Sequence, residues 1–491
     1  MKSIRLKNYK CFEDTGLLAL KPLTFLVGSN SSGKSSFLEF FALLQQSMFT
    51  SRDGAFLWVG NNVDLNDFQT VVRNGENTIC IEAEIDKIPL DAGKAIQSNV
   101  GLNDLKLNIE VSKVDNYDVI SQFCLKFNQQ EITVYLKEKE SDEVYVNGEL
   151  MTFQDEMVIH SNTNSLLPKL LFEAEIFETD SRKSRKELYS WMRQNLRDTE
   201  EDRMISPSYL FRLRNTLNRN FFEKRIERLK KEDVVINDMN HVYNLLLFNS
   251  INEIIDLVNY YMLELSNRIE FIQPLRAPAE RYYRNRNISV NKITPNGDNV
   301  AMFFLRLKKE RQLPKFNEWL HHNDLQFEVD LNEDGGFVEL KIKEDGKESK
   351  NMVDVGFGYS QILPILATIW KDLNAAPIRN ERVAYCPTSY VLIEQPELHL
   401  HPRFQRKFAD LLTKCVKQIV ENKLDIRFII ETHSQDILNS VGLSVAYGSF
   451  DSSLVNIYMF NAQHENMKNY IEKASYTKEG FLENWPIGFF D

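Results

Sequence analysis

The segment Gly28-Ser-Asn-Ser-Ser-Gly-Lys-Ser35 constrains the fold of this chain more than any other feature. It matches the GxxxxGK[ST] pattern in the context that this pattern requires, because the apolar run Leu23–Val27 precedes it and the helical run Phe37–Leu44 follows it. Glycines let the backbone curl so that its N–H groups face phosphate oxygens, and the helix N-terminus adds positive potential. In such a loop Lys34 reaches the β- and γ-phosphates, and Ser35 places its hydroxyl on Mg²⁺. The sequence therefore predicts a nucleotide-binding loop between a buried strand and a helix.

Three segments further along the chain carry polar groups where a nucleotide site needs them. The apolar run Tyr390–Ile393 leads to Glu394, which is the Walker B arrangement of a carboxylate at a strand end that holds Mg²⁺ or its waters. Another strand-like run ends near His433, a group able to approach a γ-phosphate, and Val353–Pro364 is a Gly/Ser turn that opens a helix. Each signal is weak alone, but in this order behind a phosphate-binding loop they support one another.

The composition is that of a folded, acidic protein. The 491 residues include 59 Lys and Arg against 70 Asp and Glu, a net charge of −11, and 43% are hydrophobic. This balance excludes a mainly disordered chain and argues against nonspecific coating of nucleic acid. The five cysteines form no CxxC pair and no run of about 18 apolar residues occurs, so we expect a cytoplasmic protein without disulfides, a zinc site or a membrane span. At about 150 residues per domain the length suggests about three units, although one large discontinuous domain also fits.

The middle of the chain changes its pattern twice. From about 78 to 150, segments that alternate in polarity predict an antiparallel sheet with one solvated face. From 166 to 270 the period becomes helical, and within it residues 182–231 carry 15 Lys and Arg against 7 Asp and Glu, a local net charge of +8. This basic segment has two interpretations. It is a surface that binds nucleic acid or an acidic partner, or it is a solvated helical face over an aromatic core. The strand–helix–strand order over 390–430 predicts a βαβ unit of a parallel sheet.

These motifs resemble those of ABC-type ATPases of the RecF and SMC kind, and more narrowly those of the stand-alone AAA-family ATPases related to the OLD proteins. The resemblance covers roughly 1–80 and 270–445. It implies an α/β fold: an ABC-type P-loop ATPase head formed by 1–165 and 271–491, with an antiparallel β-lobe at 79–150 and a basic helical insertion at 166–270. The segments that carry it are Ile4–Phe12, Leu23–Ser36, Phe271–Tyr282, Val355–Pro364 and Glu394–Pro402.

The resemblance also implies roles for single residues. Glu394 takes the Walker B role, His433 is the switch histidine, and Gln69 is a Q-loop residue that contacts Mg²⁺ or the attacking water. In that family a signature loop presses on the γ-phosphate of ATP in a second protomer, which implies an ATP-sandwiching homodimer or higher oligomer. The signature-loop residues are Gly356, Gly358 and Ser360, and the residues expected to bind the phosphates of ATP are Gly28, Asn30, Ser32, Gly33, Lys34, Ser35 and Ser36.

One departure from the family pattern affects catalysis. The usual pair at the end of the Walker B strand is Asp-Glu, whereas this chain has Glu394-Gln395. A glutamine side chain cannot accept a proton, so general-base catalysis from position 395 is lost. Three interpretations remain: Gln395 is native and Glu394 serves both metal and water, Gln395 is an engineered replacement of glutamate, or Glu397 acts instead. We therefore expect slow hydrolysis, which suits a switch rather than a motor.

The resemblance finally implies a biological setting. Stand-alone ATPases of this kind often accompany nucleases or toxins in bacterial antiphage systems such as Septu, PARIS and certain retrons. Only 58 residues follow His433, too few for the Toprim nuclease that OLD proteins append, so we expect a separate effector protein. The leading hypothesis is a sensor or scaffold ATPase that controls such an effector. The alternatives are a RecF- or SMC-like DNA-repair ATPase that binds DNA directly, and an ATP-dependent assembly protein.

Overall fold

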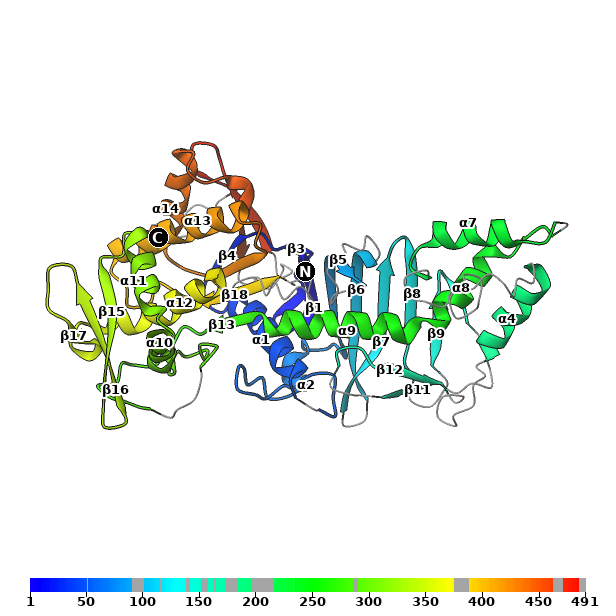
Figure 1. The fold of residues 1–491 in the computed structure, drawn as a ribbon, viewed down its shortest axis with the longest axis horizontal. Coiled ribbons are helices and arrows are strands. Elements are labelled where there is room, and N and C mark those ends of the chain that lie inside the picture. Colours follow the sequence, from blue (N-terminus) through cyan, green and yellow to red (C-terminus); the bar gives the residue numbers. More distant parts are fainter. Residues whose placement is uncertain are drawn as a thin grey trace. The chain divides into compact units, whose positions relative to one another are not determined.

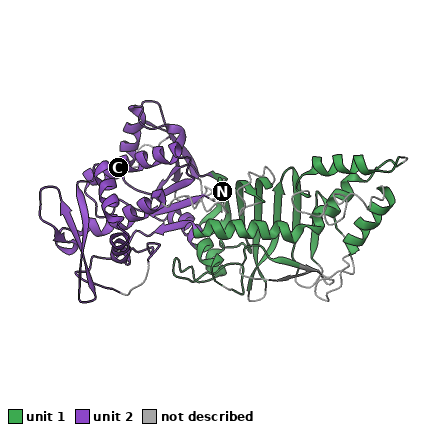
Figure 2. Cartoon of the chain, viewed as in Figure 1, with its two compact units in different colours: residues 1–18, 43–267, 379–386 green, residues 19–42, 268–378, 387–491 purple. Residues whose placement is uncertain are grey.

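The chain is divided into two compact units, each assembled from separate stretches of sequence. The computed structural model describes residues 1–50, 52–90, 101–114, 117–137, 142–151, 158–161, 165–172, 183–196, 216–232, 234–285, 290–374, 388–461 and 471–484 (Figure 1). Unit 1 comprises 1–18, 43–267 and 379–386, and unit 2 comprises 19–42, 268–378 and 387–491 (Figure 2). The short strand β3 (Leu18–Ala19) and helix α1 (Lys34–Met48) each include residues of both units.

Unit 1 is built on an antiparallel sheet with the strand order β10-β9-β8-β7-β6-β5-β1-β2. In β5 buried and partly exposed side chains alternate over most of the strand, as expected for a sheet with one covered face. A separate two-stranded ribbon joins β11 (Val158–Ser161) to β12 (Lys169–Phe172). The strands of the large sheet are β1 (Ser3–Tyr9), β2 (Phe12–Asp14), β5 (Thr78–Pro89), β6 (Gly101–Val114), β7 (Tyr117–Phe127), β8 (Gln130–Tyr135), β9 (Glu143–Val146) and β10 (Glu149–Leu150).

The helices of unit 1 pack onto these strands. Helix α9 lies across the sheet (Figure 1), and its Asn259 and Asn252 side chains pair with the backbone N–H and C=O groups of Leu167 and Leu170. The amide of Asn147, in the β9–β10 turn, donates to Asn244 of α8 at 2.7 Å. These contacts join α9 to the segment that carries β12, and α8 to the large sheet. The helices are α2 (Phe68–Val71), α4 (Lys183–Asn195), α7 (Arg219–Leu229), α8 (Met239–Asn249) and α9 (Ile251–Asn267).

Unit 2 contains a largely parallel sheet with the order β13-β18-β19-β4-β20-β21-β22, in which β21 and β22 are antiparallel. Strands β4, β18 and β20 are buried at every residue, which is typical of parallel strands covered on both faces. The strands are β4 (Leu23–Gly28), β13 (Ile269–Ile272), β18 (Ser389–Glu394), β19 (Ile426–Glu431), β20 (Val455–Phe460), β21 (Ile471–Tyr476) and β22 (Leu482–Glu483).

Helices and a smaller sheet complete unit 2. Helix α1 follows β4 after the loop of residues 29–33 and crosses the parallel sheet, with Phe37 beside Phe460 of β20 and Phe41 beside Tyr390 of β18. The smaller antiparallel sheet consists of β14 (Tyr283–Arg284), β15 (Phe327–Asp334), β16 (Phe337–Glu344) and β17 (Lys350–Asn351). The helices are α10 (Val300–Lys309), α11 (Leu313–His322), α12 (Phe357–Asn374), α13 (Pro402–Glu421) and α14 (Gln435–Ala446), with 3₁₀ turns η1 (Met352–Asp354) and η2 (Ser452–Leu454).

Most of the predicted architecture is confirmed. The fold is α/β, β5 to β10 form the expected antiparallel sheet, and β18, α13 and β19 form the expected parallel βαβ unit. The division of the chain differs from the predicted one, because the antiparallel strands are grouped with the helices of 183–267 and not with the P-loop sheet. The supposedly helical stretch 166–270 also contains β12. Among the described residues, no helix is long and apolar enough to cross a membrane.

Candidate nucleotide site

The predicted phosphate-binding loop joins β4 to α1. Its backbone takes the unusual conformations that the motif requires, with φ of +150° at Gly28, +62° at Ser31 and +102° at Gly33. A side chain at Gly28 would place its Cβ 2.2 Å from the carbonyl oxygen of Phe460, so only glycine fits there. The first turn of α1 closes with a 3.0 Å bond from the Phe37 N–H to the Gly33 carbonyl. The loop therefore has the geometry of a phosphate cradle at a helix N-terminus.

Lys34 lies folded against the inside of this loop. Its side chain is only 3% exposed, and its Nζ donates to the carbonyls of Gly28 at 3.0 Å and Ser29 at 2.7 Å. Burial lowers the pKa of Lys34, and the nearby carboxylate of Glu431, 4.0 Å from Nζ, acts in the opposite direction. The ammonium group is thus held at the loop, where the phosphates of a nucleotide would be its natural partners.

Glu431 ends strand β19, beside the loop. It is 2% exposed, and its Oε2 accepts a 2.8 Å hydrogen bond from the Ser35 hydroxyl. Burial raises the pKa of Glu431, while the Ser35 bond and the charge of Lys34 oppose the shift. Lys34, which the motif assigns to phosphate, and Ser35, which it assigns to the metal, therefore both lie next to the Glu431 carboxylate.

The predicted Walker B strand ends next to β19. Glu394 is 5% exposed and is the register partner of Glu431, so the two carboxylates are neighbours on the same edge of the sheet. Gln395 follows with φ of +42°, and its N–H donates to the Glu431 carbonyl at 2.9 Å. This bond fixes the turn after the strand and connects the ends of β18 and β19.

The buried side chain of Arg276 contacts the backbone at this turn. Its side chain is 4% exposed, and Nη2 donates to the Glu394 carbonyl at 2.7 Å. Burial lowers the pKa of Arg276 to about 10, while the carboxylates of Glu397 and Glu394 partly offset the effect. Its Nε and Nη1 are buried without a hydrogen-bond partner among the described residues. The segment that carried part of the family resemblance thus holds the Walker B backbone in place.

Glu397 holds the backbone at His433, the predicted switch histidine. One of its carboxylate oxygens accepts from the His433 N–H at 2.7 Å and the other from the Thr432 hydroxyl at 2.8 Å. Burial lowers the pKa of His433, and the positive charge of Lys34 lowers it further, so the imidazole is neutral near pH 7. Each oxygen of Glu397 accepts one bond from this loop, so Glu397 positions the backbone of His433, and its role as a base stays a prediction.

The predicted signature segment lies at the start of α12. Gly356 is exposed with φ of +113°, and Ser360 is buried, with its hydroxyl donating to the Phe357 carbonyl at 2.7 Å. A Cβ at Gly358 would lie 3.3 Å from the His399 carbonyl, and the rings of Phe357 and His399 meet edge to face. Among the described residues, no hydrogen bond or ion pair joins 356–360 to the phosphate-binding loop of the same chain.

The structure gathers some of the predicted site residues, and others stay predictions. Lys34, Ser35, Glu394, Gln395 and His433 meet at the carboxyl edge of β4, β19 and β18. The exposed Asn30, the half-buried Ser36 and the buried Ser32 lie on the loop itself or directly after it. Gln69 is exposed on α2, which belongs to unit 1, and its role stays a prediction.

Two residues at this edge were not among the predicted site residues. Glu431 directly precedes Thr432 and His433 in sequence, so an acidic residue at the end of the switch-histidine strand was the available signal. Arg276 lies in Phe271–Tyr282, which carries part of the family resemblance but no predicted site residue. Its contact with the end of β18 joins residues that are 118 positions apart in the sequence, and local sequence patterns do not reveal such a contact.

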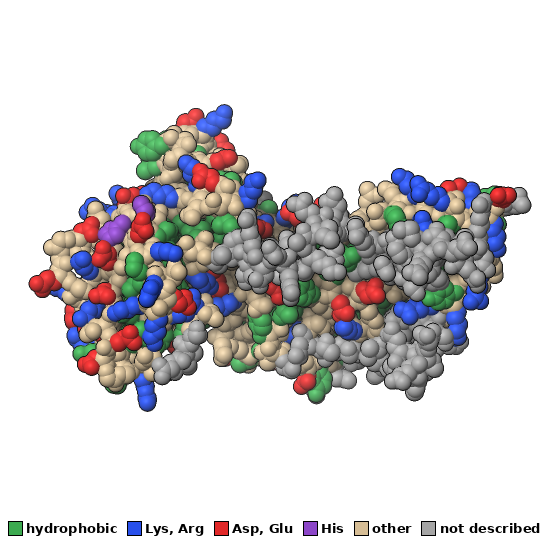
Figure 3. Space-filling model, in the orientation of Figure 1, with side chains coloured by type: hydrophobic (Ala, Val, Ile, Leu, Met, Phe, Trp, Pro, Cys, Tyr) green, Lys and Arg blue, Asp and Glu red, His purple; other side chains and the backbone are tan. Residues whose placement is uncertain are grey.

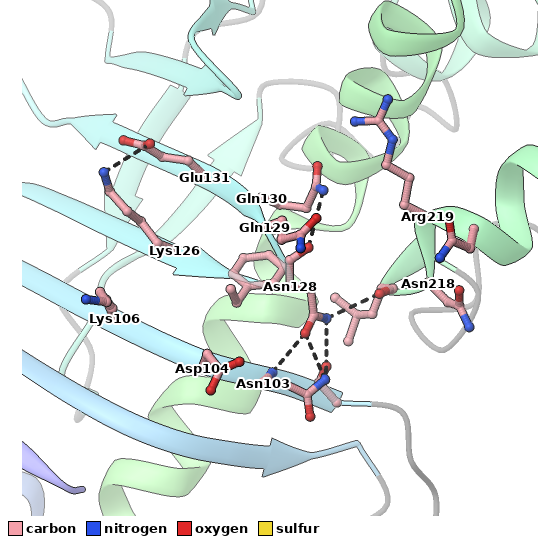
Figure 4. Close-up of a pocket in the computed structure, with 14 residues that line it drawn as sticks. Asn103, Asp104, Lys106, Lys126, Asn128, Gln129, Gln130, Glu131, Asn218 and Arg219 are labelled. Carbon is pink, nitrogen blue, oxygen red and sulfur yellow. Dashed lines mark hydrogen bonds and ion pairs between the residues drawn. The ribbon is translucent and has the colours of Figure 1, made fainter.

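A separate cavity of about 740 Å³ opens in unit 1, between the β6–β7–β8 strands and the start of α7 (Figure 4). Its polar side chains largely bind one another. Asn128 pairs with Asn103, and Lys126 pairs with Glu131 at 3.1 Å. Arg219 is bound to Glu223 and Asn240. Much of the polar lining of this cavity is therefore engaged in bonds within the described part of the protein.

Comparisons with known proteins bear on the family. No curated protein matches the sequence. Over 97% of its length the chain is similar in structure to the SMC head bound to the C-winged helix domain of ScpA, with 11% sequence identity, a TM-score of 0.35 and 97% of that chain covered. It is also similar over 97% of its length to the SMC head domain from Thermotoga maritima, with 10% identity, a TM-score of 0.33 and 98% of that chain covered. The Pyrococcus furiosus Smc head with an extended coiled coil, bound to the C-terminal domain of ScpA, is similar over 97% of this chain and 96% of its own (13%, 0.37). The model of the AAA ATPase domain matches residues 1–438, and the chain therefore belongs to this AAA ATPase family (AAA_15).

Proposed function

We propose that this member of the ATPase family binds ATP at the P-loop, hydrolyses it slowly, and dimerises around it to control a separate effector protein. The observation that carries the proposal is the convergence of Lys34, Ser35, Glu394 and His433 at one sheet edge, with a glutamine, Gln395, at the position of the usual base. We propose that the chain keeps the residues that bind ATP and respond to its γ-phosphate, while position 395 can no longer accept a proton from the attacking water.

The donors at this edge fit a magnesium ion. The Ser35 hydroxyl and the Glu394 carboxylate are hard oxygen ligands, of the kind that Mg²⁺ uses together with waters and substrate phosphates. They would hold the ion beside the loop, and Gln69 is proposed as a further contact. When bound, Mg²⁺ neutralises charge on the β- and γ-phosphate oxygens.

The chain's own residues account for the rest of the site. The N–H groups of the loop and the Lys34 ammonium bind phosphate oxygens, which positions the γ-phosphate at the edge of the sheet. Glu397 holds the backbone of His433, so that a neutral imidazole can report on the γ-phosphate. Gln395 can hydrogen-bond a water molecule but cannot take its proton.

The signature segment gives the reason for dimerisation. Its glycines and Ser360 belong to unit 2 yet have no bond to the loop of their own chain among the described residues. We infer that Gly356, Gly358 and Ser360 contact ATP bound to a second copy of the chain.

Replacing Phe357 by aspartate tests this inference. Phe357 is 48% exposed beside Gly356, so the change places a negative charge where a partner's γ-phosphate would lie without removing a core side chain. We expect ATP turnover per chain to fall at least about tenfold, because two like charges about 4 Å apart near a protein surface repel by about 4 kcal/mol, and 1.4 kcal/mol already corresponds to a factor of ten. ATP affinity of the single chain should stay unchanged.

The matched control is Phe337→Asp, since Phe337 is a 51% exposed phenylalanine on β16 of the same unit. It should keep wild-type turnover. Equal turnover in Phe357→Asp and Phe337→Asp, measured over a range of protein concentrations, would remove the signature segment from the reaction.

The effector role is the finer part of the proposal. A slowly hydrolysing ATPase stays ATP-bound for long periods, which suits a sensor or scaffold that holds a nuclease or toxin in antiphage defence. Affinity purification from the native host, with and without ATP, followed by mass spectrometry tests it. Recovery of a nuclease or toxin in stoichiometric amount would support the role, and recovery of the chain alone in both conditions would contradict it.

A basic surface in unit 1 favours a second candidate, direct DNA binding. Helices α4 and α7 both contact α8, and their ends meet where Leu196 pairs with Lys230. Figure 3 shows Lys and Arg side chains gathered at this end of unit 1. Lys186, Arg193, Lys224 and Arg228 are on these helices, and none of them has an ion pair within the described residues. Residues 197–215, which include Arg212 and Arg214 of the predicted basic segment, lie outside the described residues.

The double change Lys224→Glu and Arg228→Glu tests this surface. If it binds phosphates, DNA affinity should fall at least about tenfold at low salt, with a weaker dependence on salt, because two ion contacts are lost. The control places the same charge change at Lys87 and Lys113 on the sheet of unit 1. Fluorescence anisotropy with duplex DNA measures both, and equal affinities would rule out this surface.

A further inference from the structure

Tyr359 joins the predicted signature segment, residues 356–360, to the small antiparallel sheet of unit 2. Its hydroxyl donates a 2.8 Å hydrogen bond to Oε1 of Glu344, the last residue of β16. Its ring meets the buried ring of Phe327 on β15 edge to face, with the two ring centroids 5.0 Å apart. Phe327 and Glu344 are register partners on these two strands. The two contacts therefore hold the first turn of α12 against one place on the sheet.

The other side of this helical turn is exposed. Side chains two positions apart on an α-helix point about 200° away from each other. Tyr359 faces the sheet, so Phe357 faces away from it, and Phe357 is 48% exposed. Gly356 is exposed next to it, and Gly358 is half-buried. The face proposed to contact ATP on a second copy is thus separate from the face by which the chain holds the segment.

Tyr359 is the side chain of this segment that can form such a bond with the sheet. Glycine has no side chain, Phe357 has no polar side-chain atom, and the Ser360 hydroxyl donates within the segment to the Phe357 carbonyl. Burial raises the pKa of Tyr359 and the Glu344 bond raises it further, so the hydroxyl keeps its proton near pH 7. Bonds from Lys347 and Tyr359 lower the pKa of Glu344, so its carboxylate is ionised. A hydrogen bond to an ionised acceptor is of the stronger class.

We propose that Tyr359 is a positioning residue, which holds the signature segment through Glu344 and Phe327 in the place where it contacts ATP on a second copy of the chain. Without the bond to Glu344 the segment takes other positions as well, and only chains with a correctly placed segment assemble. The apparent affinity of assembly falls in proportion to the fraction of such chains. Each copy of a head-to-head dimer contributes a segment, so the reduction applies twice. This role rests on the proposed dimerisation around ATP.

The change Tyr359→Phe tests the role in the full chain. It keeps the ring against Phe327 and removes only the hydroxyl. We expect the dissociation constant of the ATP-dependent dimer to rise at least about fivefold, because a hydrogen bond to a charged group is worth about a factor of ten or more. ATP affinity of the single chain should stay within about twofold of wild type, since the loop of the same chain is not changed. Sedimentation over a range of protein concentrations measures the first quantity, and calorimetry on dilute protein the second.

Hydrogen exchange gives a readout that does not depend on assembly. In the single chain without nucleotide, the amides of 356–364 should exchange at least about threefold faster in Tyr359→Phe, because local opening becomes easier. Glu344→Ala removes the acceptor of the same bond, so the double variant should be no worse than the more affected single variant. The matched control is Tyr145→Phe, since Tyr145 on β9 of unit 1 also donates to a glutamate, Glu143, at 3.3 Å. It should behave as wild type.

Assembly and exchange in Tyr359→Phe equal to those in Tyr145→Phe would overturn the role. A loss of ATP affinity in the single chain as large as the loss of assembly would also overturn it, because the hydroxyl would then act on the loop of its own chain. If the wild type does not dimerise with ATP, the proposed function fails and the assembly role fails with it. The exchange at 356–364 then still decides whether Tyr359 holds the segment.

Discussion

Replacing Lys34 with methionine is expected to weaken ATP binding by at least about 100-fold. Lys34 is a 3% exposed ammonium held inside the loop by the carbonyls of Gly28 and Ser29. A hydrogen bond to a charged group contributes about 1.5 to 3 kcal/mol, so losing two phosphate contacts corresponds to about two to four powers of ten in affinity. Methionine has nearly the same length and fills the same space without the charge.

Isothermal titration calorimetry with ATP and Mg²⁺ measures this effect. Lys414→Met is the matched control, because Lys414 is an exposed lysine of α13 whose ion pair with Asp324 lies on the surface. Circular dichroism of both variants checks that the fold is intact. An affinity of Lys34→Met within threefold of the control would mean that this loop does not bind the phosphates.

Gln395→Glu is expected to raise ATP turnover by about 10- to 100-fold, since a positioned general base contributes factors of this size or larger. The backbone of position 395 is fixed by its N–H bond to the Glu431 carbonyl at 2.9 Å and by the turn that follows. A glutamate there keeps the shape of the glutamine and adds a proton acceptor at the family's usual position.

Steady-state phosphate release under saturating ATP measures the gain. Gln395→Ala serves as the control, because it removes the side chain without adding a base and should not raise the rate. Wild-type turnover at tens per second, with no further gain in Gln395→Glu, would contradict slow hydrolysis.

The sequence predicts those parts of the site in which the backbone conformation requires a particular residue type. Gly28 and Gly33 are needed where φ is positive, and at Gly28 the chain also passes close to Phe460, so the loop is recognisable in the sequence. Glu394 directly follows a buried apolar run and His433 comes three residues after another, so their places at or just beyond strand ends are also predictable.

The remaining parts depend on how distant strands pair. The proximity of Glu431 to Ser35 follows from the strand order β18-β19-β4, which joins segments about 400 residues apart and leaves no local pattern. The contact of Arg276 with the Glu394 carbonyl has the same origin. The grouping of the antiparallel sheet with the helices likewise rests on long-range amide pairs such as that of Asn147 with Asn244.

The mass of the chain in solution, with ATP and Mg²⁺ present, tests the central claim most directly. The account predicts that sedimentation gives the 57.4 kDa of a single chain without nucleotide and twice that mass, or a higher multiple, when ATP is bound. It also predicts a return to the single chain as ATP is slowly hydrolysed. A mass that stays at 57.4 kDa under saturating ATP would contradict an ATP site completed by a second copy.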